Sequence, residues 1–320
     1  MQLSRYWALG CAVAAFGTMH ASGQAYPTKV VRIVTSEPGA GADFAARMIA
    51  QGLTASFGQQ VIVENRGGAN GVIAGELVAR APPDGHTLLL FSSSFWTLPL
   101  MQKVPYDPVR DFAPITLALS SPNILVVHPS LPVKSVRDLI ALARARPGEL
   151  NYGMGSAGSA GHIGAELFRT MAGIDIVRIT YKGSGATMSA VMSGEVQLFF
   201  AGAGSAAPHL RSGKLKALAV TSAQPSVLVP GLPTIAASGL PGYECAVQTG
   251  MFAPARTAEA IITRLNQEIV RVLGSPDVRK QFAVTGVETV ASTPAEFAGK
   301  IESDMEKLGK LIRDTGIRSQ

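Results

Sequence analysis

Short apolar runs and amphipathic segments alternate along the first third of the chain. Residues 30–35, 61–63 and 87–91 are apolar, partly β-branched runs that predict strands. Residues 43–57 and 71–79 carry apolar side chains at helical spacing and predict helices. A polar or glycine-rich turn follows each predicted strand. This order is typical of an open parallel sheet with helices on both faces, which binds ligands beyond the carboxyl ends of its strands.

The pattern changes after Pro114. Two apolar stretches, residues 115–119 and 124–127, flank the polar segment 120–123. We interpret this polar segment as the point where the chain crosses into a second lobe. The alternation then begins again, which predicts strands at residues 150–152, 177–180, 196–200 and 218–221 and helices at residues 160–171 and 186–192.

A proline-rich stretch follows this second set of elements. It contains Pro225, Pro230 and Pro233, with Pro241 close behind, and predicts an extended segment that returns toward the first lobe. After it, two amphipathic patterns predict terminal helices at residues 260–273 and 294–312.

The first 25 residues have the features of an export signal. Arg5 precedes an apolar run at residues 7–16, and small and polar residues follow it up to Ala25. A membrane-spanning helix needs roughly twenty apolar residues, so this run is too short to remain as an anchor. We predict cleavage near Ala25 and a mature protein in the periplasm. A lipid anchor on Cys11 is the rival interpretation, but its neighbours match a lipoprotein site poorly.

Removing the leader leaves 295 residues, enough for two domains with separate cores. We predict an α/β protein in which residues 26–120 and 247–320 form lobe 1 and residues 121–246 form lobe 2. Crossing hinge strands are expected to join the two lobes.

Composition and charge narrow the range of partners. Charged residues make up 16% of the chain against roughly 25% in an average soluble protein. The net charge of +6 comes from lysines and arginines without a basic run interleaved with aromatic residues, which argues against nucleic acid as a partner. A positive field would favour encounter with anions, although solubility explains it equally well. Cys245 has no mature partner for a disulfide and is interpreted as a small buried hydrophobe.

Residue types for catalysis or metal binding do not gather in the sequence. It contains neither a G-x-S-x-G nor an H-E-x-x-H motif. The histidines of the mature chain lie in separate segments and are interpreted as surface or structural residues: His86, His128, His162 and His209. We therefore predict that the protein is not an enzyme and uses no metal or cofactor.

One segment does match a cofactor motif. Residues 153–158 read G-x-G-x-x-G between a predicted strand and helix, as in dinucleotide-binding sites. Asp175, however, precedes the next strand instead of closing it, and Tyr181 and Lys182 stand where the ribose-binding acid is expected. An exported protein would also not meet free nicotinamide cofactor, so we reject a dehydrogenase.

The same turn still suits an anion. Its small residues let backbone amides approach a ligand, and the helix start offers unpaired N–H donors with a partial positive charge. Residues 38–43 form an equivalent turn in lobe 1, and residues 92–94 add serine hydroxyls beyond the third strand. We predict that both helix starts face the space between the lobes and hold a carboxylate. An ordinary strand-to-helix turn explains either motif alone equally well.

Several stretches together resemble a known family. From Tyr26 onward the chain is similar to the Bug-type substrate-binding proteins of tripartite tricarboxylate transport systems, and the matching stretches are residues 38–43, 63–69, 82–89, 151–159, His162, 181–183, 213–220 and 231–234. The resemblance implies a two-lobed, type II-like periplasmic-binding-protein fold that closes on a carboxylate held by amides, hydroxyls and ordered waters. It also implies delivery to separate membrane subunits, with no catalysis and no cofactor.

The chain departs from the family pattern at several positions. Ala40 stands where relatives usually have a second glycine, so a left-handed backbone there would be strained. Glu37 replaces an apolar or small residue and either enters the cleft or points outward. Ala201 or Gly202 stands where many relatives carry an aspartate, and Gln248 where they carry a tryptophan. The ligand of a close relative therefore cannot be carried over.

The expected ligand contacts come from both helix starts and the neighbouring strand ends. They are Ser36, Glu37, Gly39, Ala40, Gly41, Ala42, Ser92, Ser93, Ser94, Gly155, Ser156, Gly158, Ser159, Ala160, Ala201 and Gly202. We predict a monomer that captures a small organic acid and delivers it to the membrane subunits of a tripartite tricarboxylate-type transporter. The alternatives are a secreted hydrolase of a small carboxylate or ester and a ligand-sensing protein without its own transporter.

Overall fold

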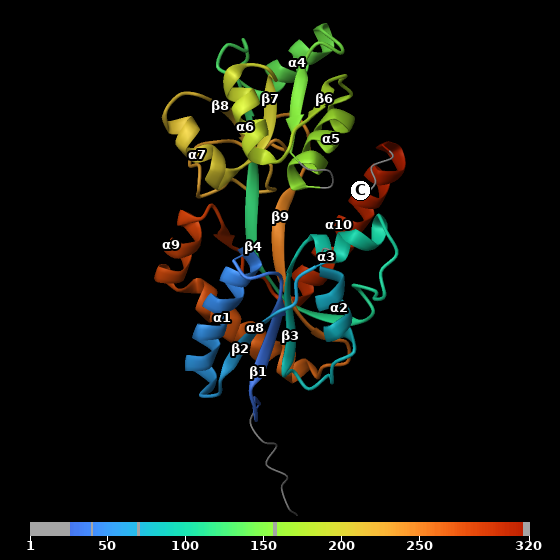
Figure 1. The fold of residues 1–320 in the computed structure, drawn as a ribbon, viewed down its shortest axis with the longest axis vertical. Coiled ribbons are helices and arrows are strands. Elements are labelled where there is room, and N and C mark those ends of the chain that lie inside the picture. Colours follow the sequence, from blue (N-terminus) through green and yellow to red (C-terminus); the bar gives the residue numbers. More distant parts are fainter. Residues whose placement is uncertain (1–25, 40, 69–70, 156–158, 316–320) are drawn as a thin grey trace, which may run out of the picture.

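The computed structural model describes residues 26–39, 41–68, 71–155 and 159–315. The predicted leader and three predicted contact residues, Ala40, Ser156 and Gly158, lie outside these ranges. Within them the chain forms two α/β lobes stacked along the long axis of the molecule (Figure 1).

The sheet of lobe 1 runs in the order β2-β1-β3-β9-β4. Its strands are β1 (Val31–Thr35), β2 (Val61–Asn65), β3 (Thr87–Ser92), β9 (Ala246–Pro254) and the first part of β4 (Phe112–Val127), with β10 (Glu288–Thr289) paired to β4. β1 is parallel to β2 and β3, whereas β9 is antiparallel to β3 and β4. β1 and β3 are nearly continuous apolar runs because helices bury them on both faces.

Two helical layers cover this sheet. One core joins it to α1 (Gly41–Phe57), α8 (Glu259–Gly274) and α9 (Pro276–Val284). The other joins it to α2 (Val72–Ala79), α3 (Ser94–Thr97) and α10 (Pro294–Thr315), and the 3-10 turn η2 (Leu98–Leu100) follows α3. Buried side chains such as Leu53 in the first core and Phe297 in the second each contribute roughly 1.5–3 kcal/mol to folding, so both layers add substantially to stability.

Lobe 2 repeats the same architecture. Its sheet runs from β8 (Lys216–Val220) through the second part of β4 to β7 (Leu198–Gly202), β5 (Asn151–Met154) and β6 (Val177–Thr180). Separate cores join one face to α4 (Val136–Ala145) and α5 (Ala160–Ala172), and the other face to α6 (Ser184–Ser193) and α7 (Ala203–Arg211). The predicted strands and helices are therefore found with small shifts at their ends, whereas α3, α4, α7, α9 and β10 had not been predicted.

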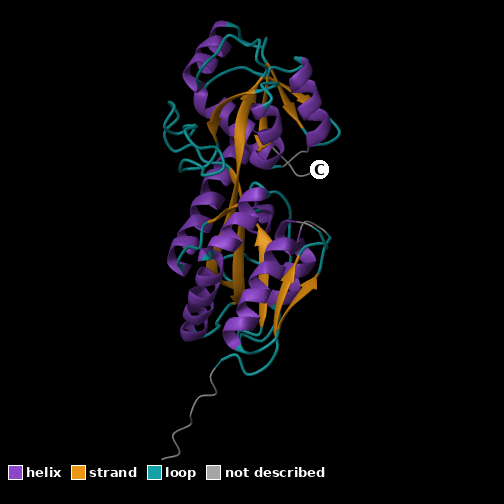
Figure 2. Cartoon of the chain, turned by 90° about the vertical axis from the view of Figure 1, so that its left-hand side faces the viewer, coloured by secondary structure: helices purple, strands orange, loops and turns teal. Residues whose placement is uncertain are grey.

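A single long strand, β4, passes from one lobe into the other (Figure 2). Residues 120–123, which the sequence marks as a break between two apolar stretches, continue this strand because β9 pairs with it up to Pro122. Beyond that point the Asn123 N–H donates to the Thr221 hydroxyl at 2.9 Å, and β7 and β8 take over the pairing. The predicted lobe boundaries stay a prediction. None of the helices in the described part of the chain is long and apolar enough to span a membrane.

Candidate ligand-binding site

Strand direction places the carboxyl ends of the parallel strands of both lobes at their junction. β4 runs from lobe 1 into lobe 2, and β3 runs parallel to it because both are antiparallel to β9. β3 and its parallel neighbour β1 therefore end facing lobe 2. β7 is antiparallel to β4, so β7 and its parallel neighbour β5 end facing lobe 1. Open α/β sheets bind ligands at such edges.

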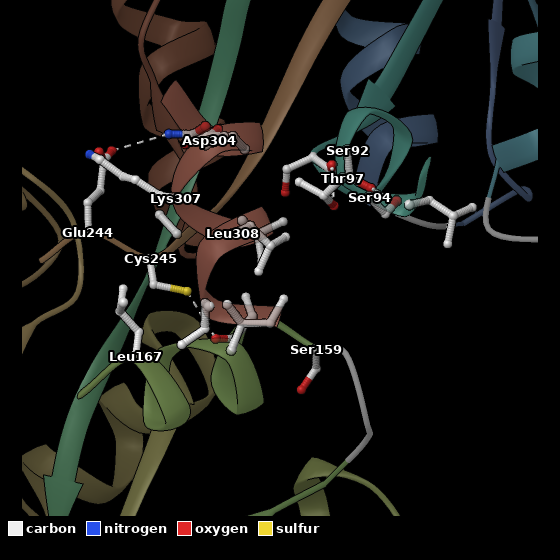
Figure 3. Close-up of a pocket in the computed structure, with 18 of the residues that line it drawn as sticks. Ser92, Ser94, Thr97, Ser159, Leu167, Glu244, Cys245, Asp304, Lys307 and Leu308 are labelled. Carbon is white, nitrogen blue, oxygen red and sulfur yellow. Dashed lines mark hydrogen bonds between the residues drawn. The ribbon is translucent and has the colours of Figure 1, made fainter. Parts of the chain in front are cut away.

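A pocket of about 530 Å³ lies at this junction (Figure 3). Its walls come from the end of β3 with α3 and η2, from the first turns of α5, from the segment that leads into β9, and from α10. This volume is typical of sites for small molecules. The predicted contact residues that line it are Ser92, Ser93, Ser94, Ser159 and Ala160.

Hydroxyl groups form the wall from lobe 1. The Ser92 and Ser94 hydroxyl oxygens lie 2.8 Å apart. The Ser93 N–H donates to the Gln248 carbonyl at 2.7 Å, which ties this turn to β9. The Thr97 hydroxyl donates to the Ser93 carbonyl at 2.9 Å. Because each hydroxyl has one donor and two acceptor positions, Ser92 and Ser94 keep capacity to bind a ligand.

The wall from lobe 2 is the start of α5. Ser159 is its N-cap residue, and the Ser159 hydroxyl accepts a hydrogen bond from the His162 N–H at 3.3 Å. The Cys245 thiol donates to the Ala160 carbonyl at 3.2 Å. Burial raises the pKa of Cys245 to about 12, so this thiol stays protonated at neutral pH. The helix start thus offers N–H donors and a partial positive charge to the pocket.

A cluster of charged side chains on and beside α10 forms the third wall. Lys300 Nζ lies 3.1 Å from Glu244 Oε2 and also contacts the Asp304 carboxylate. The Trp96 indole N–H donates to Asp304 Oδ2 at 3.2 Å. Burial raises the pKa of Asp304. Burial alone would lower the pKa of Lys300, but the two carboxylates outweigh it and raise that pKa. Two carboxylates therefore share one ammonium group here.

Three buried polar atoms near the junction have no hydrogen-bond partner among the described residues: Ser36 Oγ, Asn123 Nδ2 and Gln248 Oε1. Ser36 follows β1, Asn123 lies where β4 changes sheets, and Gln248 lies near the start of β9. These residues expose 7%, 6% and 5% of their surface, respectively. Folded proteins pair nearly all such groups, so these atoms mark positions for ordered water or a ligand.

The turn between β1 and α1 is held by an acid and does not line the pocket. The Asp43 carboxylate accepts hydrogen bonds from the Gly39 N–H at 2.9 Å, from Arg47 Nε at 3.2 Å and from Asn65 Nδ2 at 2.8 Å. Burial would raise the pKa of Asp43, but the hydrogen bonds from Arg47, Asn65 and Gly39 outweigh it and lower the pKa to about 2. Asp43 is therefore ionised at neutral pH.

Glu37 takes the outward of the two orientations that the sequence allows. Its side chain is exposed, and Glu37 Oε1 accepts a hydrogen bond from the Gly68 N–H at 2.7 Å. Its own backbone N–H and that of Gly68 lower the pKa of Glu37. The carboxylate therefore fastens the β1–α1 turn to the neighbouring β2–α2 turn.

Eight described residues predicted to contact a ligand do not line the pocket: Ser36, Glu37, Gly39, Gly41, Ala42, Gly155, Ala201 and Gly202. They lie at the ends of β1, β5 and β7, in the turns that follow, or at the start of α1, and their role in binding stays a prediction. Gly155 has a packing reason of its own, because a Cβ there would lie 2.6 Å from the Ser184 backbone nitrogen. This close approach explains the glycine without a dinucleotide.

Sequence reasoning missed the wall formed by α10 and the segment before β9. One signal was available: Lys300, Asp304, Lys307, Leu308 and Leu311 recur at helical spacing and share one face of the predicted helix. Their meeting with Glu244 and Gln248 depends on how β9 returns to lobe 1, which no local pattern reveals.

The buried histidine of lobe 2 has a structural role. His162 Nε2 lies 3.1 Å from Arg178 Nη1, and burial lowers the pKa of His162, so the neutral ring accepts this bond. The neighbouring Glu166 accepts hydrogen bonds from Tyr152 and Arg169. Across the described residues, no group of three potential metal ligands comes together.

Two α/β lobes, joined by the paired strands β4 and β9 and enclosing a pocket at facing carboxyl ends, define a two-lobed solute-binding protein. Residues 45–317 match the tripartite tricarboxylate transporter family receptor, and the chain belongs to this family.

Named relatives and solved structures agree with this assignment. The chain is 36% identical to protein BugT of Bordetella pertussis over 301 residues, which cover 93% of this chain and 92% of BugT. R. palustris Rpa4515, solved with adipate, is 36% identical with a TM-score of 0.69, and the match covers 92% of this chain and all of that one. MatC from Rhodopseudomonas palustris, solved with malate, is 28% identical with a TM-score of 0.66 over 90% of this chain and all of MatC.

Proposed function

We propose that the protein is an exported receptor that captures a small organic acid between its lobes and delivers it to the membrane subunits of a tripartite tricarboxylate-type transporter. The observation that carries this proposal is the pocket between the serine hydroxyls of lobe 1 and the start of α5. Such a set of neutral donors suits a carboxylate. Two family members solved with adipate and malate support the same class of ligand.

The carboxylate is expected to lie between Ser92, Ser94 and Ser159. Hydroxyl and backbone N–H donors at these positions would surround its oxygens, together with the backbone of Ala160. Hydrogen bonds to a charged group contribute roughly 1.5–3 kcal/mol each, so a few of them suffice for micromolar affinity. The loss of any one should therefore be measurable.

Closure of the lobes is expected to bring the remaining predicted contacts to the ligand. The two crossing strands pair through Ser120 with Gln248 and Pro122 with Ala246, which makes a narrow two-stranded hinge. Hinge closure around a ligand is an established motion of two-lobed binding proteins. Gly39 and Gly155 follow strands whose carboxyl ends face the junction, and Gly202 ends such a strand, so closing would move all three toward the pocket.

We infer binding without catalysis. The Cys245 thiol is protonated and donates to a backbone carbonyl, so it is a poor nucleophile. His162 is neutral and engaged with Arg178, and therefore supports the fold instead of acting as a base. No feature of the pocket favours the hydrolase alternative.

A thermal-shift and calorimetry screen tests this function on protein recovered from the periplasm. Adipate, malate and other small acids should stabilise the protein, by about 4 kcal/mol at a thousand times the dissociation constant.

Small-angle scattering should show a monomer that becomes more compact with a saturating acid. The intact mass should correspond to cleavage near Ala25. Stabilisation by sugars or neutral amides while every acid fails would overturn the carboxylate assignment.

A further inference from the structure

We propose that Gln248 makes the pocket select acids whose far end carries a hydrogen-bond donor, such as a hydroxyl, an amide N–H or an ammonium, over acids that carry a second carboxylate there. This inference rests on the proposed function, because it takes one carboxylate to be held by the serines and the start of α5. It concerns the opposite end of the same ligand.

The orientation of the Gln248 side chain follows from its neighbours. Gln248 Nε2 lies 3.4 Å from Glu244 Oε1, and the Glu244 carboxylate is held in place by Lys300 at 3.1 Å. An ionised carboxylate only accepts hydrogen bonds, so the amide must turn its nitrogen toward Glu244. The oxygen, Gln248 Oε1, is then the atom left over.

This oxygen is a buried acceptor on a residue that lines the pocket. Gln248 exposes 5% of its surface and lines the pocket, and Oε1 has no partner among the described residues. The backbone of Gln248 is fixed, because its carbonyl accepts a hydrogen bond from the Ser93 N–H and the residue pairs with Ser120. A ligand that brings a donor to this position fills an otherwise unmet hydrogen bond.

A second carboxylate at this position would meet the wrong partners. It would place acceptor oxygens against Gln248 Oε1 and close to Glu244, whose charge shares the Lys300 ammonium with Asp304. Sites built around a buried hydrogen-bonding group discriminate strongly against analogues that leave that group unpaired. The exposed Lys307 also lines the pocket, and no acid pairs with it among the described residues, so it is the competing anchor for a second carboxylate.

Matched acids distinguish these possibilities by calorimetry. A six-carbon series comprises hexanoate, 6-hydroxyhexanoate, 6-aminohexanoate, adipic monoamide and adipate. A four-carbon series carries the same far-end groups, beginning with butanoate and ending with succinate. In at least one series, the amide, hydroxy or amino acid should bind about tenfold tighter than the simple monocarboxylate, and the dicarboxylate should not. Lys307→Met should leave this preference in place.

Gln248→Met is the decisive variant, because it keeps the volume and removes the acceptor Oε1, together with the Nε2 donor that faces Glu244. The variant should bind the donor-bearing acids and the simple monocarboxylate with about equal affinity. Its affinity for the simple monocarboxylate should stay within about twofold of the wild-type value. The ligand-free variant loses the 3.4 Å contact between Gln248 Nε2 and Glu244 Oε1 but also an unpartnered buried oxygen, and because these two effects oppose each other its melting temperature should change little. If water alone satisfies this oxygen, the variant will change all affinities equally, which overturns the inference.

Two further outcomes distinguish failure of the role of Gln248 from failure of the proposed function. Tighter binding of the dicarboxylate, lost in Lys307→Met and kept in Gln248→Met, would overturn the role of Gln248 and leave the proposed function intact. Failure of every acid in both series and of malate would overturn the carboxylate assignment and this inference with it.

Discussion

The two helix starts that face the junction are held in different ways. In lobe 1 the start of α1 is fastened by Asp43, whose ionised carboxylate receives the Gly39 N–H. In lobe 2 the start of α5 is capped by the neutral hydroxyl of Ser159. A negative charge at a helix start offsets its partial positive charge, whereas a neutral cap leaves it available to a ligand. The two turns look equivalent in sequence, but because of this difference in capping we expect lobe 2 to provide the stronger anion site.

The rest of the pocket follows the same division. Lobe 1 contributes fixed charges through Lys300 and Asp304, which already neutralise one another in part, together with serine hydroxyls. α10 also reaches across the junction, because Leu308 packs with Ile163 of α5. We therefore expect the start of α5 to attract the carboxylate and lobe 1 to orient the ligand, with Lys307 on α10 as a further cation in the pocket wall. Substitutions at four positions test this comparison.

Lys300→Met should have the largest effect, because it removes the ammonium that two partly buried carboxylates share. Breaking a buried charge cluster leaves uncompensated charges, and we expect a loss of about 3 kcal/mol in the free energy of unfolding by urea. The lost stability should partly return at acidic pH, where Asp304, whose pKa burial raises, takes up a proton. Lys307→Met is the control on the same helix and should stay within about 0.5 kcal/mol. Equal stability of the two variants would mean that the cluster on α10 is unimportant for folding.

Asp43→Asn should cost about 2 kcal/mol, because an amide replaces a carboxylate that accepts from Gly39, Arg47 and Asn65. The folded pKa of about 2 lies below the ordinary value of 3.8, so this stabilisation is present above the ordinary value and is lost as pH falls toward 2. The difference between wild type and variant should therefore shrink below about pH 4. The exposed Asp175→Asn is the control in lobe 2, and a pH-independent difference would contradict this role of Asp43.

The sequence predicts those parts of the fold that depend on residues close together in the chain. The spacing of apolar residues predicts strands such as β1, helices such as α1 and the helical face of α10. α4 carried a readable start, because the Ser135 hydroxyl accepts the Asp138 N–H at 3.1 Å. α7 was hidden by Pro208 within it.

The pocket was only half predictable for the same reason. Ser92 and Ser159 stand at strand ends or helix starts, where the rule for α/β sheets places ligands. Gln248 stood out as a departure from the family. Its oxygen is left unpaired because its nitrogen faces Glu244, which Lys300, a residue distant in sequence, holds in place. Likewise β4 is continuous across a polar segment only because β9 pairs with it.

Ser159→Ala tests the anion site of lobe 2 directly. It should weaken acid binding about tenfold, or ~1.4 kcal/mol, and cost about 1 kcal/mol of stability through the lost cap. Ser135→Ala removes an equivalent cap far from the pocket and should cost similar stability without changing affinity. Ser159→Asp keeps a good cap but places a negative charge beside the ligand, so it should fold well and nearly abolish binding. Unchanged binding in both Ser159 variants would remove α5 from the anion site.

Glu37→Gln should have the smallest effect. Glu37 is exposed and its carboxylate bonds the Gly68 N–H, and a glutamine oxygen can accept the same hydrogen bond. Affinity for mono- and dicarboxylates should therefore stay within about twofold in calorimetry. The informative alternative is selective: tighter binding of dicarboxylates alone would mean that closure carries Glu37 into the cleft, where its charge repels a second carboxylate. Lobe 1 would then oppose the ligand with two acids at one helix start, Glu37 and Asp43, and the contrast between the lobes would be sharper in the closed state than in the state described here.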